Sequence, residues 1–132
     1  MRCLNSEVQI AGPQDVFDLV GQEMRNLGNE VVKLVCLDAQ NRMISCETIL
    51  NGLVDLALLR PREVFERALK CSANSVVLVH NHPSGSPYPS DSDVYVTKKL
   101  VRVGRLIGVR VQDHVIVWNG GYTSMRALGL VR

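Results

Sequence analysis

The feature that most constrains this chain is an apolar run at 75–79 that leads directly into two histidines, His80 and His82. The run Ser-Val-Val-Leu-Val is largely β-branched, which favours a strand buried on both faces. Because side chains alternate along a strand, residues i and i+2 point to the same face, so both imidazoles can reach one ion. We therefore expect a central strand that presents two metal ligands at its end.

The segment after the histidines limits how the chain continues. Residues 83–89 contain three prolines and a glycine, so this loop joins neither a helix nor a sheet ladder. Ser90 and Asp93 follow, and Ser-x-x-Asp is typical of a helix start, where the serine caps the helix and the acid suits its dipole. Asp93 also has a second interpretation, because two histidines, one carboxylate and a water are the ligands of a catalytic zinc.

The size and composition of the chain predict one domain. A chain of 132 residues with 46% hydrophobic and 21% charged residues suits one globular core, and we place it at 12–132 after an extended arm at 1–11. The sequence contains no apolar run of the ~20 residues that span a bilayer and no signal-peptide pattern, so a cytoplasmic location is expected. A net charge of +2 is too small to argue for a polyanionic partner.

The four cysteines show no metal-binding spacing. They are scattered, without a Cys-x-x-Cys pair, at Cys3, Cys36, Cys46 and Cys71. We expect reduced thiols, with those in apolar segments acting as small buried hydrophobic groups.

Periodicity and turn residues predict strands flanked by helices. Helices are expected from Pro13 to Leu27 with Gly28 as the terminating residue, from Pro61 with Val64, Phe65, Ala68 and Leu69 facing inward, and from Ser90 with Val96, Leu100 and Val103 facing inward. Strands are expected at 30–38, 43–50, 75–82, 109–118 and 122–124, with a hairpin turn at Asn41 and a final helical turn at 125–128. This order favours a mixed α/β layered domain with a mostly antiparallel, curved sheet.

A longer pattern extends the candidate site into a family resemblance. The spacing His80-x-His82-x7-Ser90-x2-Asp93 matches the JAMM (MPN+) metalloprotease motif. The surrounding His-Asn-His-Pro-Ser-Gly, Pro-Ser-x-x-Asp, Gly-Val-Arg-Val-x-Asp-His and upstream Pro-Arg-Glu-Val resemble the RadC family of bacterial JAMM-like domains, over nearly the whole chain from residue 12. The resemblance implies a cytidine-deaminase-like α/β fold, although the His-x-Glu and Pro-Cys-x-x-Cys of true deaminases are absent.

The resemblance also implies roles for individual residues. His80, His82 and Asp93 would bind zinc with water as the fourth ligand, Glu30 at the start of the first strand would be the general base, and Ser90 would stabilise the oxyanion.

Several assignments stay open at the level of sequence. Glu47 and Glu63 compete with Glu30 for the role of base. His114 either hydrogen-bonds a ligand or only lies near the site, and Ser84 and Gly85 are expected to shape the loop, with Ser84 close enough to contact substrate.

A nucleic-acid partner has weak support from the sequence. The basic residues Lys98, Lys99, Arg102, Arg105 and Arg110 fit a solvated helix face better than a binding stripe, because no aromatic residues for base stacking are interleaved. RadC-family members commonly carry an amino-terminal helix-hairpin-helix region that this chain lacks, so we expect either a short form or an excised domain.

These observations predict a zinc-dependent hydrolase of JAMM type, in which metal-bound hydroxide attacks an amide or isopeptide bond of a peptide or protein. The alternatives are a DNA-repair-associated protein, either a metal-dependent nuclease or a non-catalytic accessory, and an interaction module held together by structural zinc. A single site with two histidines and one aspartate favours amide hydrolysis over phosphodiester chemistry, which often uses two ions.

Overall fold

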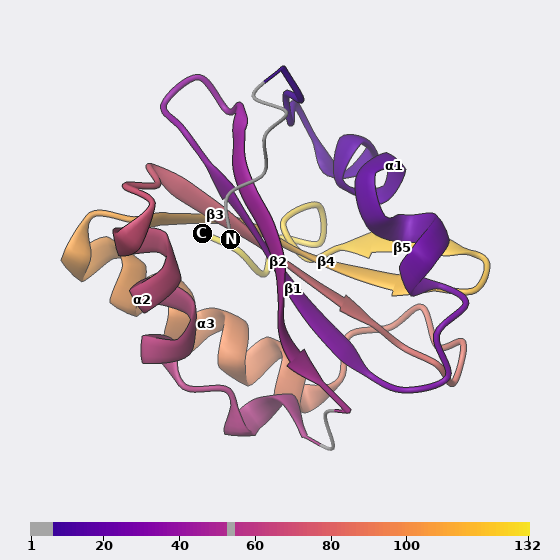
Figure 1. Ribbon diagram of the computed structural model, residues 1–132. Helices are drawn as coiled ribbons and strands as arrows, with labels where there is room; N and C mark the ends of the chain where they lie inside the picture. The colour runs from indigo at the N-terminus through magenta and orange to yellow at the C-terminus, as the bar shows by residue number, and fades with distance from the viewer. Residues whose placement is uncertain (1–6, 53–54) are drawn as a thin grey trace.

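The fold is a five-stranded sheet between two helical layers, seen in a computed structural model that describes residues 7–52 and 55–132 (Figure 1). The elements in these residues are α1 (Pro13–Met24), β1 (Val31–Leu37), β2 (Met43–Asn51), the 3-10 helix η1 (Leu56–Leu58), α2 (Pro61–Lys70), β3 (Ser75–Asn81), α3 (Asp91–Ile107), β4 (Arg110–Trp118) and β5 (Gly121–Ser124).

The sheet has the strand order β2-β1-β3-β4-β5, and only the β3–β4 pair is parallel. Figure 1 shows α1 on one face and α2 with α3 on the other. The prediction of a mixed α/β layered domain with a mostly antiparallel sheet is therefore confirmed. No helix in the described ranges has both the length and the apolar composition needed to cross a bilayer.

Strand β3 is the centre of the sheet, and all seven of its residues are buried. Val76 and Leu78 belong to the core under α2 and α3, whereas Val77 and Val79 belong to the core under α1. Each fully buried side chain of this kind contributes about 1.5–3 kcal/mol by leaving water. Burial on both faces explains why an unbroken apolar run, not an alternating pattern, precedes His80.

The β1–β2 hairpin turns where its sequence predicts. Asn41 adopts the left-handed φ of 62°, a conformation that asparagine tolerates better than most residues. The carboxylate of Asp38 accepts hydrogen bonds from the backbone N–H groups of Gln40 and Arg42, both at 2.9 Å. Ile10, in the predicted arm, lies beside this turn and is buried, with its N–H donating to Asn41 at 2.9 Å.

The first helix ends earlier than predicted. α1 stops at Met24, and Gly28 is not among the described residues with positive φ, so Gly28 does not terminate the helix. The side-chain amide of Asn81 donates to the carbonyl oxygens of Met24 and Asn29. These hydrogen bonds from β3 hold the segment after α1 in a non-helical path, a tertiary effect that periodicity cannot show.

The inner stripe predicted for α2 is correct except for Leu69. Val64, Phe65 and Ala68 are buried, but Leu69 is 57% exposed. Leu69 lies about 100° around the helix from Ala68, which turns it out of the core at the last full turn. On α3, Val96 and Leu100 are buried and Val103 is partly buried against the same core.

Cys36, Cys46 and Cys71 are free thiols, as predicted, while Cys3 lies outside the described residues. Burial raises the pKa of Cys36 to about 12, so this thiol is neutral at physiological pH and unreactive.

The close approach of α3 to the start of β4 predicts a stability effect. A Cβ at Gly104 would lie 2.3 Å from the carbonyl oxygen of Val109. Alanine favours a helix over glycine by about 1 kcal/mol, but the clash outweighs this gain. Gly104→Ala is therefore expected to lower the free energy of unfolding by about 1–3 kcal/mol. Gly28→Ala is the control, because a Cβ there meets nothing within 4 Å. Urea denaturation measures both; equal stabilities would contradict the packing argument.

Candidate metal centre

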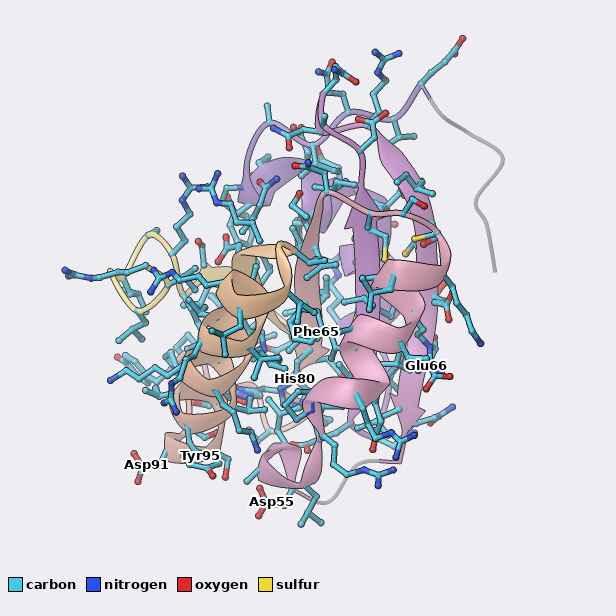
Figure 2. All side chains as sticks on the ribbon, turned by 90° about the vertical axis from the view of Figure 1, so that its left-hand side faces the viewer. Asp55, Phe65, Glu66, His80, Asp91 and Tyr95 are labelled. Carbon is cyan, nitrogen blue, oxygen red and sulfur yellow. The ribbon has the colours of Figure 1, made fainter. Side chains whose placement is uncertain are left out.

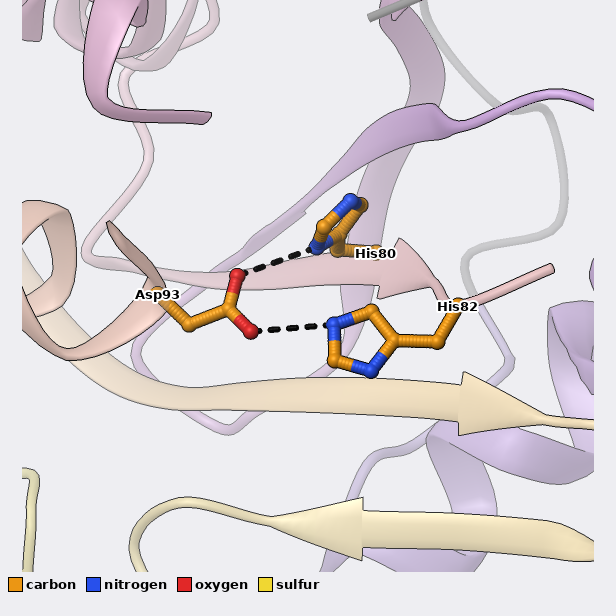
Figure 3. Close-up of side chains that lie close together, drawn as sticks. All are labelled: His80, His82 and Asp93. Atoms are coloured by element: carbon orange, nitrogen blue, oxygen red, sulfur yellow. Dashed lines mark hydrogen bonds and ion pairs between the residues drawn. The ribbon is translucent and has the colours of Figure 1, made fainter. Parts of the chain in front are cut away.

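The candidate centre lies where β3 ends and α3 begins (Figure 3). His80 is the penultimate residue of β3, and His82 follows the strand directly. His82 stays extended because its N–H donates to the carbonyl oxygen of Val117 in β4 at 2.8 Å. The two rings are edge to face with their centroids 5.2 Å apart, so both imidazoles serve one site as the i, i+2 spacing predicts.

Asp93 reaches this site because it is also part of the cap of α3. The Ser90 hydroxyl accepts the Asp93 N–H at 3.0 Å, and Asp93 Oδ2 accepts the Ser90 N–H at 2.8 Å. Asp93 Oδ2 lies 3.0 Å from His82 Nε2, and Oδ1 lies 3.3 Å from His80 Nδ1. The capping and the ligand interpretations of Asp93 are thus geometrically compatible, since the cap aims the carboxylate at the histidines.

The three side chains fit a metal ion. One ligand atom from each of His80, His82 and Asp93 lies within 4.8 Å of the others. Asp93 is fully buried and the two histidines are nearly so. Within the described residues, both ring nitrogens of His80 and Oδ1 of Asp93 are buried and form no hydrogen bond, although His80 Nδ1 and Asp93 Oδ1 face each other at ion-pair distance. Buried polar atoms are normally satisfied, so these open positions favour an ion as the missing partner.

The hydrogen bonds of His82 strengthen this fit. Its Nδ1 lies 3.0 Å from the carbonyl oxygen of Ser86, which can only accept, so Nδ1 carries the hydrogen. In the neutral ring Nε2 then presents its lone pair to the Asp93 carboxylate, and two acceptors at 3.0 Å repel each other. Only a proton or a metal ion on Nε2 removes this repulsion. The hydrogen bond to Asp93 accordingly raises the pKa of His82 above its ordinary value.

Asp93 itself is held as a carboxylate. Burial works to raise its pKa, but the imidazoles of His80 and His82 and the N–H of Ser90 outweigh burial and hold the pKa well below its usual range. The group is thus ready to bind a cation.

Glu30 lies at the same end of the sheet. β1 runs antiparallel to β3 with Val32 opposite His80, and Glu30, two residues earlier, points to the same face as Val32. Its Oε2 is 3.7 Å from His80 Nε2, and its side chain is 33% exposed. The competing glutamates lie elsewhere: Glu47 pairs with Arg67, and Glu63 pairs with Arg60.

The site opens into a cleft of about 650 Å³. The cleft is lined by Glu30, Asp55, Leu56, His80, His82, Ser84, Ser86, Tyr88, Pro89, Ser90, Ser92 and Asp93. Asp55, which the sequence analysis missed, caps η1 by accepting the Ala57 N–H at 2.9 Å. It lies at the same end of the molecule as Asp91, the first residue of α3 (Figure 2). No local pattern distinguishes Asp55 from the other acids, because η1 reaches the cleft only through the tertiary fold.

His114 lies beside the centre as a neutral, buried ring. Its centroid is 6.1 Å from that of His80, and its Nδ1 lies 2.6 Å from the Thr97 hydroxyl. Burial lowers its pKa to about 3. Within the described residues the hydrogen bond of His114 is with Thr97 and not with a predicted ligand, which favours the second of the two sequence interpretations.

The loop residues behave as expected. Gly85 adopts a φ of 87°, where a side chain would be strained, and the Ser84 hydroxyl accepts the Ser86 N–H at 3.4 Å. Ser84 also lines the cleft.

Comparison with known proteins agrees with this geometry. A family described as "RadC-like JAB domain" matches residues 10–130. The chain is 46% identical to a UPF0758 protein of Caldanaerobacter subterraneus subsp. tengcongensis, over 91% of this chain and 52% of the relative. It is 43% identical to a UPF0758 protein of Symbiobacterium thermophilum (94% and 53%) and 40% identical to one of Methanosarcina barkeri (94% and 54%). The chain spans about half the length of the curated relatives it matches.

The fit of the three ligands predicts metal-dependent stability. Zn²⁺ at 100 times its Kd should stabilise the folded chain by about 2.7 kcal/mol, seen as a higher Tm than in chelator. His82→Ala and Asp93→Ala should lose this gain because each removes a ligand. Asp38→Ala is the control: it should cost about 1 kcal/mol by loss of the hydrogen bonds from the Gln40 and Arg42 N–H groups at the far end of β1 yet keep the gain. An undiminished gain in Asp93→Ala would contradict the ligand assignment.

Proposed function

The chain belongs to the RadC family, and from that premise we propose that it is a zinc-dependent hydrolase of JAMM type that cleaves an amide or isopeptide bond. One observation carries the proposal: two imidazoles and a buried carboxylate converge at the floor of an open cleft, with a second carboxylate, Glu30, 3.7 Å from His80.

The donor set supports zinc as the metal. His80, His82 and Asp93 provide two nitrogens and one oxygen, the number and type of protein ligands that catalytic zinc sites use. A zinc ion held there supplies Lewis acidity and lowers the pKa of a bound water from 15.7 to about 7. The Ser86 carbonyl oxygen holds the His82 ring by its Nδ1–H, which orients Nε2 toward Asp93 and fixes the tautomer that binds metal.

Glu30 is suited to accept and transfer the proton of the attacking water. Its carboxylate lines the cleft beside His80 and is partly exposed, so it reaches both the buried floor and an incoming substrate. We assign to it the removal of a proton from the attacking water and delivery of that proton to the leaving amine. A positioned general base of this kind contributes about 10²–10⁴-fold.

Ser90 is suited to donate to the oxyanion. Its oxygen already accepts the Asp93 N–H, so its own O–H is free of that bond and lies at the cleft wall. Donation from this hydroxyl to the developing amide oxyanion would stabilise the tetrahedral intermediate, an effect that elsewhere is worth roughly 3 kcal/mol.

The assignment of Glu30 is tested by Glu30→Gln with Glu47→Gln and Glu63→Gln as controls. Glu30→Gln should bind Zn²⁺ but lower kcat for a peptide or isopeptide substrate by about 10²–10⁴-fold, because glutamine cannot accept the proton. Both controls should keep full activity, since their carboxylates pair with Arg67 and Arg60. Full activity in Glu30→Gln would refute the role of Glu30. A zinc-bound wild type without hydrolysis would favour the structural-zinc module.

A second candidate function, binding to a duplex nucleic acid, is favoured by one surface. Two adjoining hollows of about 400 and 450 Å³ lie between α3 and the C-terminal segment. Among the residues that the structure describes, six basic residues and no acidic residue line the two hollows; the six are Lys98, Arg102, Arg105, Arg110, Arg126 and Arg132. None of them forms an ion pair within the described residues. We call this surface the basic groove.

The basic groove fits phosphates better than bases. Arginine pairs with phosphate in a bidentate manner, and no aromatic residue lines either hollow, so contacts to a duplex backbone are favoured over stacking on single strands. The groove supports the DNA-associated alternative without implicating the metal cleft.

Binding to duplex DNA at 50–200 mM salt tests this candidate. The double variant Arg102→Ala/Arg105→Ala should weaken binding and reduce the slope of log K against log salt by ~2. The double variant Arg62→Ala/Lys70→Ala, which removes two exposed positive charges from α2 outside the groove, is the charge-matched control and should change neither. No binding by the wild type at 50 mM salt would eliminate this candidate.

A further inference from the structure

Asn81 lies between the two candidate ligands on β3 but faces the opposite side of the sheet. His80 and His82 point toward α3, whereas the Asn81 side chain reaches the end of α1, where it donates to the carbonyl oxygen of Met24 at 3.3 Å. Asn81 is 1% exposed. A buried amide at this position is costly unless its donors and acceptor are used.

The hydrogen bonds of Asn81 converge on the residues that flank Glu30. Asn81 Oδ1 accepts the Val31 N–H at 2.7 Å, and Asn81 Nδ2 donates to the carbonyl oxygen of Asn29 at 3.0 Å. The backbone on both sides of Glu30 is therefore tied to a residue that is covalently adjacent to both histidines. Three consecutive residues at the end of β3 thus provide two candidate metal ligands and the hydrogen bonds that hold the backbone on both sides of Glu30.

The bond to Asn29 matters because Glu30 precedes β1. The regular β1–β3 pairing has Val32 opposite His80 as its terminal pair, and Glu30 is two residues beyond it. Two other hydrogen bonds also hold this segment: the Gly52 N–H donates to the carbonyl oxygen of Glu30 at 2.9 Å, and the Asn29 side-chain amide donates to Asn51. Both come from the end of β2, whereas Asn81 ties the segment to β3, the strand that leads into the two histidines. A misplacement of about 1 Å can cost a reaction 10²-fold, so a bond that fixes this segment has a direct effect on the geometry of the site.

We propose that Asn81 is a positioning residue that fixes the Glu30 carboxylate relative to His80 and His82, an inference that rests on the proposed function of Glu30. Asn81 acts through backbone hydrogen bonds on the far face of the sheet, so it touches neither metal nor substrate. Its loss should displace Glu30 and leave the three ligands in place.

The test compares Asn81→Ala and the milder Asn81→Ser with Ser75→Ala. Ser75 lies at the opposite end of β3, is buried, and accepts a side-chain hydrogen bond from Gln112 at 2.6 Å, so its loss also removes a buried hydrogen bond from the same strand. The variants are measured for Zn²⁺ affinity, for kcat and KM, for hydrogen exchange of the Val31 amide without metal, and for the ¹³C shift of the Glu30 carboxylate on addition of Zn²⁺.

Both Asn81 variants should keep Zn²⁺ affinity and KM but lower kcat about 10- to 100-fold. Their Val31 amide should exchange faster, and their Glu30 signal should respond less to Zn²⁺. In a Glu30→Gln background, Asn81→Ala should lower kcat no further. Ser75→Ala should show none of these changes.

Three results would overturn the proposal: an equal loss of kcat in the Glu30→Gln background, the same loss in Ser75→Ala, or unchanged Val31 exchange in Asn81→Ala. If the zinc-bound wild type hydrolyses no amide bond, the proposed function is refuted, but this result does not decide the role of Asn81. The role of Asn81 is then decided by Val31 exchange and by the response of Glu30 to Zn²⁺, and wild-type values of both in Asn81→Ala refute it.

Discussion

The burial of β3 on both faces is the constraint on which the rest of the structure depends. Helices α2 and α3 cover one face of this strand and α1 covers the other, so its side chains have no route to solvent except at the strand end. His80 directly follows the apolar run, and its two ring nitrogens are buried polar atoms. An imidazole nearly excluded from water needs partners, and Asp93 with a cation satisfies it better than any group of the apolar core.

The carboxylate of Asp93 belongs to the cap of α3 and is also a candidate metal ligand. The Ser90 cap orients Asp93 by two backbone-linked hydrogen bonds, which fix its position before any ion binds. The low pKa of Asp93 keeps its carboxylate charged. The hydrogen bond from His82 Nδ1–H to the carbonyl oxygen of Ser86 fixes the tautomer of His82. A site assembled from one strand end and one helix cap therefore needs little rearrangement to bind an ion, which is the condition for a rigid catalytic centre.

Much of the fold and part of the site could be predicted from local patterns. The strand predicted at 75–82, which ends one residue earlier at Asn81, depends on residues close in sequence. The same holds for the Asn41 turn, the Pro61 helix start and the Ser90–Asp93 cap, and the structure contains all four elements. The end of α1 was predicted wrongly because a hydrogen bond from Asn81, which is distant in sequence, decides it. The exposure of Leu69 was predicted wrongly because the last turn of α2 points this side chain away from the core. Asp55 was missed for a related reason, since η1 reaches the cleft from a segment without periodicity.

The sequence by itself determined the candidate ligand set, because the i, i+2 alternation of a strand and the i, i+3 reach of a helix cap place His80, His82 and Asp93 within a short span of chain. Only the tertiary structure decided which glutamate accompanies them. Glu30 is 50 residues before His80 in the sequence and comes within 3.7 Å of it through the antiparallel register of β1 and β3. Glu47 instead pairs with Arg67 of α2, and Glu63 pairs with Arg60, the residue before α2. Register and packing act between segments distant in sequence, and no local pattern encodes their result.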